Sequence, residues 1–548
     1  MAKQLVSSPL ENLGVNGLNT QYNPATLDPA WLTSADNIMI RESGRISFRK
    51  GLKQKVVPSG VAIGSMVEHN DQGTNKIFAS HGTSIYTVDF GSPNAAFPSS
   101  GADVKHTVGS TTGNWQFVNF NNRLHCFHTG VIPQRYDGAL SAGSRWTAHA
   151  TDPASITTLF DPSCGMGFYG RLWVGGVTEA PDVVYYSVLL DGDDWTSTGT
   201  GFIDLKTVWG TDEIVHIAAF FGKLVIFGKN NIAIYDTPDD AANMSLNEVV
   251  SGIGLVNRDT VQAIGDDLVF LSSTGLRSLN RTTEKDKLPL IDYSVNIKDT
   301  LIRNIGQSTN IKSVYVENEG IYIMTFPALN ITYVFDFKHY TPNNAPRVTT
   351  WTFNNDREPA SMSYTDTYGL LVGQKDGGLA GYEGYYDVDL AVNGTTFSSS
   401  SYTSNIETTW VNLGESISST LLKRLFIVLE GGSGANLGVK WYKDYSPSPS
   451  ETTQITLNPV TTGNTSLWGA SSSLYGATNT GGAHANSGHN ATLHSSASTF
   501  KPVFGLREYK TPLTGSAKNL KLEIDITSNG FDASLQDLTL LHKQGKIR

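Results

Sequence analysis

A hairpin pattern of apolar and polar positions recurs along the first two thirds of the chain. Each copy has a glycine or polar turn, an apolar strand, a second turn and another strand with tyrosine or another apolar residue near its end. Successive copies lie about 49 residues apart, which is the period of a β-propeller blade rather than of a helical solenoid. The apolar anchors of the seven copies are Ile77, Leu124, Leu172, Leu224, Leu268, Ile321 and Leu370.

The residues of these copies suit strands buried inside a ring. Runs such as 224–227 are apolar at every position, as expected where a strand is covered on both faces. Gly, Asn and Asp at the turns supply the positive φ that short hairpins need. One blade cannot bury both of its faces, so the ring needs a closing strand. We predict that the N-terminal hairpin at 36–50 closes it, with Ile38, Ile40, Ile46 and Phe48 on one face.

The pattern changes from about residue 386. Further strands are predicted in a second β domain, at 406–410, 423–429, 437–442, 519–526 and 535–541. Residues 444 to about 500 are rich in Ser, Thr, Gly, Asn, Ala and Pro, with little apolar area to offset the entropy of ordering. We interpret them as a long insertion.

The predicted fold is therefore all-β, a β-propeller of six or seven blades followed by a second β domain. The expected parts are an N-terminal extended segment and ring-closing hairpin (1–60), the propeller (61–385) and a C-terminal β domain (386–548) with its Gly/Ser/Thr-rich insertion at about 444–500.

Composition agrees with this class and limits the partners. The 548 residues include 54 Gly, and only 16% are charged. A net charge of −10 argues against a protein that binds nucleic acid tightly. An acidic channel wall would nevertheless let DNA pass without retaining it. The basic residues at 542–548 are interpreted as a solvated tail. No apolar run approaches the length of a membrane helix or a signal peptide, so we expect a soluble protein, made in a reducing cytoplasm, with no membrane anchor.

Two polar groups resemble metal sites only superficially. His484, His489 and His494 lie five residues apart in the insertion, without nearby thiol or carboxylate ligands. The run Asp191–Trp195 resembles part of a calcium loop, but the twelve-residue ligand pattern with its closing Glu is absent. We interpret the histidines as polar loop residues and the acidic run as a surface turn, and we predict no metal site.

Motifs of catalysis are also missing from the sequence. It contains no Gly-x-Ser-x-Gly, no P-loop and no Gly-x-Gly-x-x-Gly after a strand. Cys126 has His125 and His128 beside it, but strand alternation sends His125 to the opposite face, and no helix follows to activate the thiol. We expect Cys126 to be a buried structural residue. No catalytic residue and no cofactor is nominated, and the protein is not expected to be an enzyme.

Three stretches carry a family resemblance. The opening residues include Gly17-Leu18-Asn19, Ala35-Asp36-Asn37, Gly44-Arg45-Ile46 and Arg49-Lys50-Gly51. The middle includes Val184-Tyr185-Tyr186-Ser187, Asp193-Asp194-Trp195, Ile203-Asp204 and Gly222-Lys223-Leu224-Val225-Ile226-Phe227. Together with Leu538-Thr539-Leu540 and Lys543-Gln544-Gly545-Lys546, they resemble tail proteins of short-tailed bacteriophages, namely the tail nozzle (tail tubular protein B) and packaged-DNA stabilisation proteins. The resemblance covers about residues 14–385 well and the C-terminal domain loosely.

The resemblance implies a virion tail protein and supplies no catalytic residue. Members of this family form a ring, usually a hexamer, below the portal and head-to-tail adaptor. That ring continues the channel through which genomic DNA leaves, without sequence-specific binding, and it offers a surface for tail fibres or spikes. We therefore expect a structural nozzle subunit that helps to retain packaged DNA.

Two other functions remain open from the sequence. In the first, the propeller or the insertion binds a glycan of the host surface. Aromatic residues at the blade tips would favour this function. Alternatively, the propeller would depolymerise a host polysaccharide.

Overall fold

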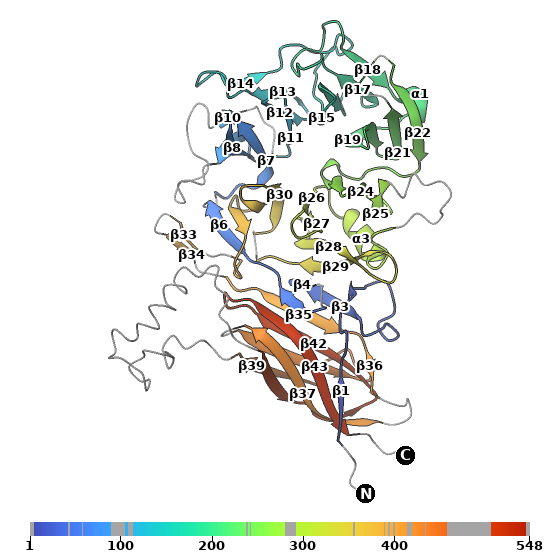
Figure 1. The fold of residues 1–548 in the computed structure, drawn as a ribbon, viewed down its shortest axis with the longest axis vertical. Helices are drawn as coiled ribbons and strands as arrows, with labels where there is room; N and C mark the ends of the chain where they lie inside the picture. The colour runs from blue at the N-terminus through green and yellow to red at the C-terminus, as the bar shows by residue number, and fades with distance from the viewer. Residues whose placement is uncertain are drawn as a thin grey trace.

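The computed structural model describes most of the chain. The described residues are 5–41, 44–56, 59–88, 105–107, 113–236, 239, 241, 243–279, 292–354, 357–387, 390–392, 395–397, 400–413, 419–432, 435–457 and 506–543. They form a ring of small sheets, with a β domain attached at one side of the ring (Figure 1). None of the helices among these residues has the length and apolar character needed to cross a membrane.

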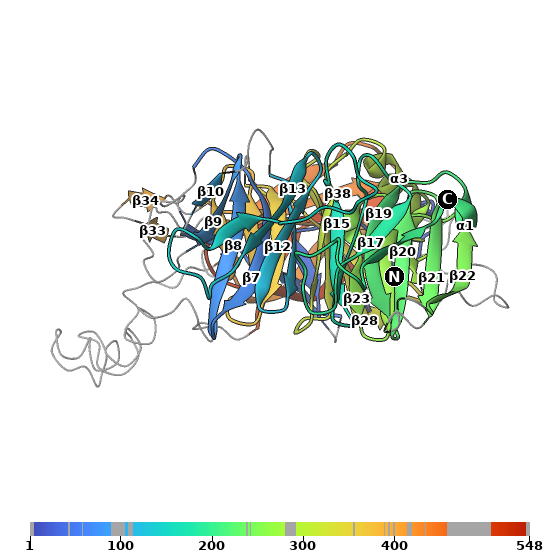
Figure 2. The same cartoon turned by 90° about the horizontal axis from the view of Figure 1, so that it is seen from above.

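Seven small sheets form the ring, and all their strand pairs are antiparallel. Five of them are separate four-stranded sheets, the fifth along the chain has three described strands, and the sixth consists of four strands at the end of a larger sheet. Seen from above, the strands run across the thickness of the ring (Figure 2). The fold class predicted from the sequence, a β-propeller followed by a second β domain, is confirmed.

The first four blades follow one another along the chain. They consist of β7 (Ile63–Asp71), β8 (Thr74–His81), β9 (Ser84–Val88) and β10 (Lys105–Thr107); β11 (Gln116–Phe120), β12 (Arg123–His128), β13 (Val131–Tyr136) and β14 (Trp146–Ala148); β15 (Cys164–Phe168), β16 (Arg171–Gly175), β17 (Val183–Tyr186) and β18 (Gly201–Asp204); and β19 (Ile214–Phe220), β20 (Lys223–Gly228), β21 (Asn231–Asp236) and β22 (Ser245–Ser251).

The last three blades complete the ring. They consist of β23 (Gln262–Ile264), β24 (Asp267–Ser272) and β25 (Gly275–Ser278); β26 (Lys312–Val316), β27 (Ile321–Phe326), β28 (Ile331–Tyr340) and β29 (Pro346–Trp351); and β30 (Pro359–Thr365), β31 (Gly369–Gln374), β32 (Leu379–Tyr382) and β6 (Leu52–Val56). The part of the chain that the structure describes also contains three short helices between strands, α1 (Lys206–Trp209), η1 (Arg258–Thr260) and α3 (Lys298–Ile305).

The seven predicted anchors identify the blades one by one. Each lies in the second strand of a different blade, in β8, β12, β16, β20, β24, β27 and β31, and each is at most 5% exposed. The apolar run at 224–227 is completely buried, because one face of β20 packs towards blade three and the other towards blade five. The period seen in the sequence is therefore the blade period of the structure.

The ring is closed by a different N-terminal strand from the one expected. β6 supplies the outermost strand of blade seven by pairing with β32. The hairpin at 36–50, which comprises β4 (Ile38–Ile40) and β5 (Ile46–Phe48), instead joins a sheet of the C-terminal domain, where β5 pairs with β43 (Ala533–Lys543). The apolar hairpin thus belongs to the core of the second domain, and the more polar strand after it performs the closure.

The C-terminal domain is built from two sheets whose apolar faces share one core. One sheet contains β4, β5, β43, β37 (Thr420–Gly431), β40 (Arg507–Pro512), β1 (Leu5–Pro9) and β41 (Ser516–Ala517). The other contains β2 (Gly17–Leu18), β3 (Trp31–Asp36), β35 (Thr403–Thr408), β36 (Val411–Asn412), β42 (Asn519–Thr527), β38 (Asn436–Lys443) and β39 (Glu451–Thr456). A short hairpin, β33 (Leu390–Val392) with β34 (Thr395–Phe397), precedes β35 along the chain.

The second of these sheets continues into the propeller without a break. β29 of blade six pairs with β2 and with β3, and β3 pairs with β35 of the C-terminal domain. Gly17 in β2 allows this close approach, because a Cβ there would lie 2.7 Å from the carbonyl oxygen of Val348. Propeller and C-terminal domain are therefore joined by backbone hydrogen bonds, not only by a linker.

The predicted insertion begins later than expected. The strand β39 lies within 444–500, and Leu457 is completely buried in the core of the C-terminal domain. Residues 458–505, which include His484, His489 and His494, lie outside the described residues, as do residues 544–548 of the basic tail.

A buried arginine ties the N-terminal segment to both domains. The guanidinium of Arg49 is completely buried and forms an ion pair with the equally buried Asp387, with each of its terminal nitrogens 2.8 Å from a carboxylate oxygen. It also lies between the rings of Phe353 and Tyr402, 4.6 and 4.1 Å from their centres. These partners follow blade seven, follow blade six and precede β35, respectively, so one side chain contacts all parts of the joint.

Asn37 completes this joint through its amide. Its Oδ1 accepts hydrogen bonds from Arg49 Nε (2.8 Å) and from the backbone N–H of Thr352 (3.0 Å). Its Nδ2 donates to the carbonyl of Thr403 at 2.9 Å. Position 51 admits only glycine, because a Cβ there would lie 2.0 Å from the carbonyl oxygen of Tyr386.

The burial of the blade anchors predicts a large difference between two leucines of blade four. Leu224→Asp places a carboxylate at a completely buried position, and we expect a loss of several kcal/mol, about 3 or more, and an unfolded propeller. Leu246→Asp, at a 43% exposed position of β22, is the control and should change the stability by less than about 0.5 kcal/mol. Thermal unfolding followed by circular dichroism measures both, and equal melting temperatures for the two variants would contradict the blade assignment.

Candidate functional site

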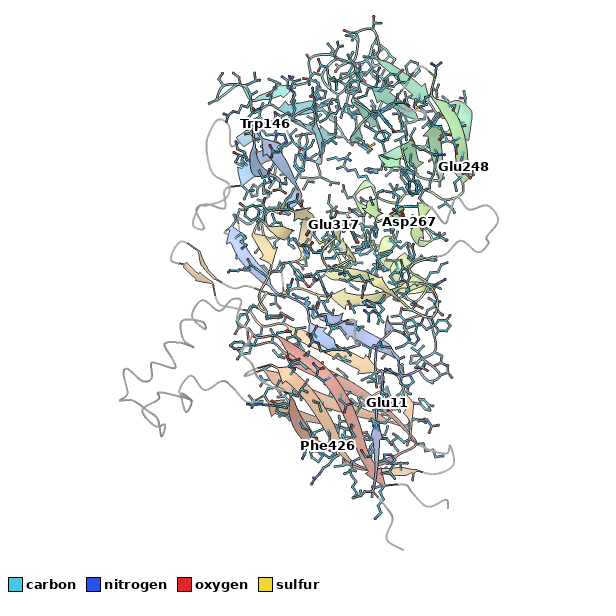
Figure 3. All side chains as sticks on the ribbon, viewed as in Figure 1. Glu11, Trp146, Glu248, Asp267, Glu317 and Phe426 are labelled. Atoms are coloured by element: carbon cyan, nitrogen blue, oxygen red, sulfur yellow. The ribbon has the colours of Figure 1, made fainter. Side chains whose placement is uncertain are left out.

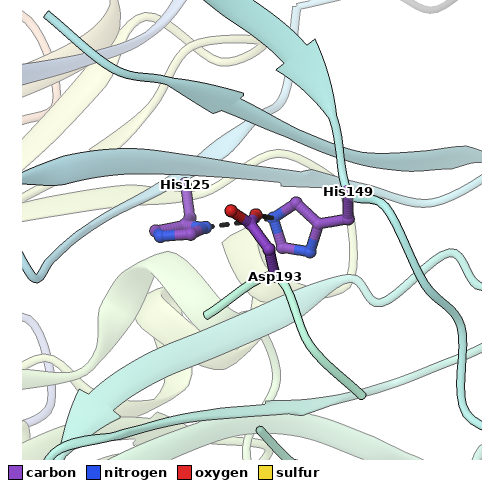
Figure 4. Close-up of side chains that lie close together, drawn as sticks. All are labelled: His125, His149 and Asp193. Atoms are coloured by element: carbon purple, nitrogen blue, oxygen red, sulfur yellow. Dashed lines mark hydrogen bonds and ion pairs between the residues drawn. The ribbon is translucent and has the colours of Figure 1, made fainter. Parts of the chain in front are cut away.

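A buried cluster of two histidines and an aspartate lies between blades two and three. His125 belongs to β12, His149 follows β14, and Asp193 lies in the loop after β17 (Figure 4). His125 Nδ1 lies 3.0 Å from His149 Nε2, which lies 3.6 Å from Asp193 Oδ1. Among the described residues this is the one group of three such side chains close enough to hold a metal ion.

The hydrogen bonds of the cluster determine which ring nitrogens carry protons. The indole N–H of Trp195 can only donate, and it lies 3.2 Å from His149 Nδ1, which must accept. A neutral His149 then carries its proton on Nε2 and donates to His125 Nδ1. The chain of donors runs from Trp195 through His149 to His125.

This arrangement does not fit a metal ion. A metal would need the lone pair of His149 Nε2, which the bond from Trp195 leaves protonated. In addition, Asp193 Oδ2 accepts hydrogen bonds from Arg123, at 3.2 Å, and from Arg135, so two cations already offset the charge of this carboxylate. The two imidazoles and the ion-paired carboxylate join the two blades.

Burial also controls the protonation of these groups. It lowers the pKa of His125 to about 3, with Arg135 and Arg123 adding to the effect, and lowers the pKa of His149 well below its usual value. For Cys126, burial raises the pKa well above its usual value, so the thiol stays protonated. Cys126 packs with Phe78 and Ile85 of blade one, whereas His125 faces blade three, as strand alternation predicts.

The acidic run at 191–195 has a structural role in this network. Asp193 and Trp195 are buried members of it, and the Asp191 carboxylate accepts a hydrogen bond from the backbone N–H of Asp193 at 3.0 Å. Sequence reasoning treated the run as a surface turn and missed its link to His149. No sequence pattern links Trp195 to His149, because their contact joins loops of different blades more than 40 residues apart in the chain.

A second feature is the cavity at the centre of the ring, with a volume of about 220 Å³. Its walls come from the innermost strands β7, β11, β19, β23, β26 and β30. Arg258 of η1 reaches from blade five to the carbonyl oxygens of Ser163 and Asn114, which precede blades three and two. Lys312 donates to Asp259 at 2.7 Å beside it. Such a cavity holds a few molecules the size of water, each about 30 Å³, and no strand of DNA.

A third feature lies between blades five and six, where a cavity of about 290 Å³ is lined by aromatic rings. Tyr293, Tyr315, Phe337 and Tyr340 form much of its wall, and the carboxylates of Asp267 and Glu317 also line it. The positions of these two acids in neighbouring blades can be followed in Figure 3.

Aromatic residues also occupy two exposed blade tips. Tyr169 and Phe221 are 46% and 66% exposed at the turns β15–β16 and β19–β20. Their φ angles are 46° and 47°, a region that favours Gly and Asn, and Asn121 has this conformation in the matching turn of blade two. Leu189 and Leu190 lie beside Gly170 in the same area, and both are more than half exposed.

Comparison with known proteins assigns this chain to no family. No protein-family model and no curated protein matches the sequence. The Pan2 WD40 domain of Neurospora crassa is similar at 9% identity and a TM-score of 0.38, covering 61% of this chain and 96% of its own. YCF48 from Cyanidioschyzon merolae is similar at 11% identity and a TM-score of 0.39, covering 61% of this chain and 98% of its own.

The neutral histidines predict a specific loss of stability in acid. An unfolded histidine takes up a proton as the pH falls below about 6.5, whereas His125 in the folded chain does so near pH 3. The stabilisation is therefore complete above pH 6.5 and is lost as the pH falls from there towards 3, at up to about 1.4 kcal/mol per pH unit for each such group.

His125→Asn tests this dependence, because the Asn amide oxygen can accept the bond from His149 while the titrating ring is gone. Denaturant unfolding at a series of pH values should show a shallower decline for the variant than for the wild type. Parallel curves for the two proteins would show that His125 does not take up a proton on unfolding in this range.

Proposed function

We propose that this chain is a structural subunit of a tail nozzle in a short-tailed bacteriophage. The observation that carries the proposal is the location of the residues on which the family resemblance rests. Gly17, Asn37, Arg49 and Gly51 all lie in the joint between the propeller and the C-terminal domain, where each has a specific steric or hydrogen-bonding role. Shared residues of this kind are expected where proteins share one joint between two domains.

The central cavity supports a particular route for DNA in such a nozzle. Because each propeller is closed at its own centre by Arg258 and Lys312, DNA does not run through the propeller. In our proposal it runs through a lumen surrounded by several copies of the chain, most simply a hexamer. The net charge of −10 suits a wall that lets a polyanion slide without retaining it.

The proposed ring has neighbours above and around it. One end of the ring meets the head-to-tail adaptor, and the outer surface receives tail fibres or spikes. Heterologous contacts that close under rotation generate such a ring from one kind of subunit. The role is structural, and the protein acts in the virion tail.

Assembly of the purified chain tests this proposal. Mixed with the portal–adaptor complex of the same virion, the full chain should give a complex whose native mass contains an integral ring of copies. The adaptor complex alone is the control. A chain that stays monomeric and unbound at micromolar concentration would contradict the nozzle assignment.

The aromatic blade tips favour a second candidate function, the binding of a host-surface glycan. Tyrosine and phenylalanine rings offer flat apolar surfaces on which a sugar ring can pack. A residue other than glycine in the left-handed region lowers the stability of the fold by about 1–2 kcal/mol, and a side chain exposed to solvent makes no packing contacts that offset this cost. The tips at Tyr169 and Phe221 are turns between first and second strands, as are those at Gly265 and Gly320 beside the aromatic cavity. A Cβ on Gly222, next to Phe221, would lie 3.3 Å from the hydroxyl oxygen of Tyr169, so the tips of blades three and four adjoin.

Phe221→Asn separates strain from binding. Asparagine tolerates this backbone conformation, so the variant should gain about 1 kcal/mol of stability and lose glycan binding if this face recognises sugars. Gln72→Asn, at the matching turn of blade one with φ 51°, is the control and should keep any binding. A glycan array without signal for the wild-type protein would leave this second candidate without support.

A further inference from the structure

The central cavity has a built polar wall that lies outside the proposed nozzle contacts. Trp115 and Lys312 line it while only 2% and 5% exposed, and Arg258 and Asp259 of η1 line it beside them. These residues come from different blades, so the closed ring is what brings them together. Buried charges at such a convergence need partners or a ligand.

The charges of this wall do not balance. Arg258 and Lys312 are cations, and Asp259 is the carboxylate that faces both, with Lys312 Nζ 2.7 Å from its Oδ2 and Arg258 Nε 3.5 Å from its Oδ1. The imidazole of His216 is neutral, because burial lowers its pKa to about 4. For Lys312, burial lowers the pKa, and the charge of Asp259 acts in the opposite direction. With Arg258 and Lys312 both charged against the one carboxylate of Asp259, the group has one excess positive charge.

Several polar atoms of the residues that line the cavity have no hydrogen-bond partner among the described residues. They are Trp115 Nε1, Arg258 Nε and His216 Nδ1. The first two are N–H groups that can only donate, so they lack an acceptor. A bound anion would accept hydrogen bonds from these N–H groups and would also balance the excess positive charge.

We propose that the central cavity binds a small tetrahedral oxyanion of the phosphate type. The cavity of about 220 Å³ holds such an ion together with a few waters, but not a polymer. Lys312 and Arg258 supply the attraction, and Asp259 holds both cations in place while weakening the attraction by its own charge. Binding would draw the inner strands of several blades to one ligand.

The test is calorimetric titration of the full-length chain with inorganic phosphate, in chloride buffer of constant ionic strength. We expect saturable binding of phosphate and of sulfate, and at least about tenfold weaker binding of planar acetate. Lys312→Met should weaken phosphate binding about tenfold or more, whereas Asp259→Asn, which keeps the acceptor for Lys312 but removes a negative charge, should tighten it.

Lys229→Met is the matched control, because it removes the same charge from an exposed lysine that pairs with Glu213 on blade four. It should bind phosphate like the wild type. If Lys312→Met does not fold, the opposite shift expected for Asp259→Asn still decides the matter. No saturable binding, equal binding of acetate, or unchanged affinity in Asp259→Asn would each overturn the proposal. None of these outcomes depends on whether the chain assembles into a nozzle.

Discussion

The ion pair of Arg49 with Asp387 is the constraint on which the arrangement of the two domains depends. Both side chains are completely buried, so neither is tolerable without the other, and removing one partner of such a pair costs about 3–5 kcal/mol. The pair is satisfied only when the N-terminal segment, the exits of blades six and seven and the entry to β35 are all in place. It therefore selects one arrangement of the domains, which the continuous sheet through β29, β2, β3 and β35 then extends.

The same physical rule explains the polar groups elsewhere in the propeller. Inside blades two and three, burial keeps His125 and His149 neutral. The two arginines there, Arg123 and Arg135, face two carboxylates, because Asp193 contacts both arginines and Asp137 also pairs with Arg123, so the charges balance. At the ring centre the rule is not met, because two cations face one carboxylate. That contrast is why we treat the first group as structural and the second as a ligand site.

Part of this structure was predictable because its signals are local. The seven anchors follow from apolar runs and turn residues, and each identified its blade correctly. The closing strand was missed because Leu52–Val56 alternates with lysines and glutamine, as an outer strand does, whereas the hairpin before it is more apolar and suggested a core strand. The joint at Arg49, and the contact of His149 with Trp195, depend on residues brought together by ring closure, for which a single sequence carries no spacing rule.

Electron microscopy of the purified virion tail, at a resolution that traces strands, distinguishes a nozzle subunit from a peripheral tail protein. We expect rings of this chain around the tail axis, each copy with its propeller and C-terminal domain joined at Arg49, and DNA density in the lumen between copies. Density for this fold found only in peripheral appendages, or DNA running through a propeller's own centre, would contradict this expectation.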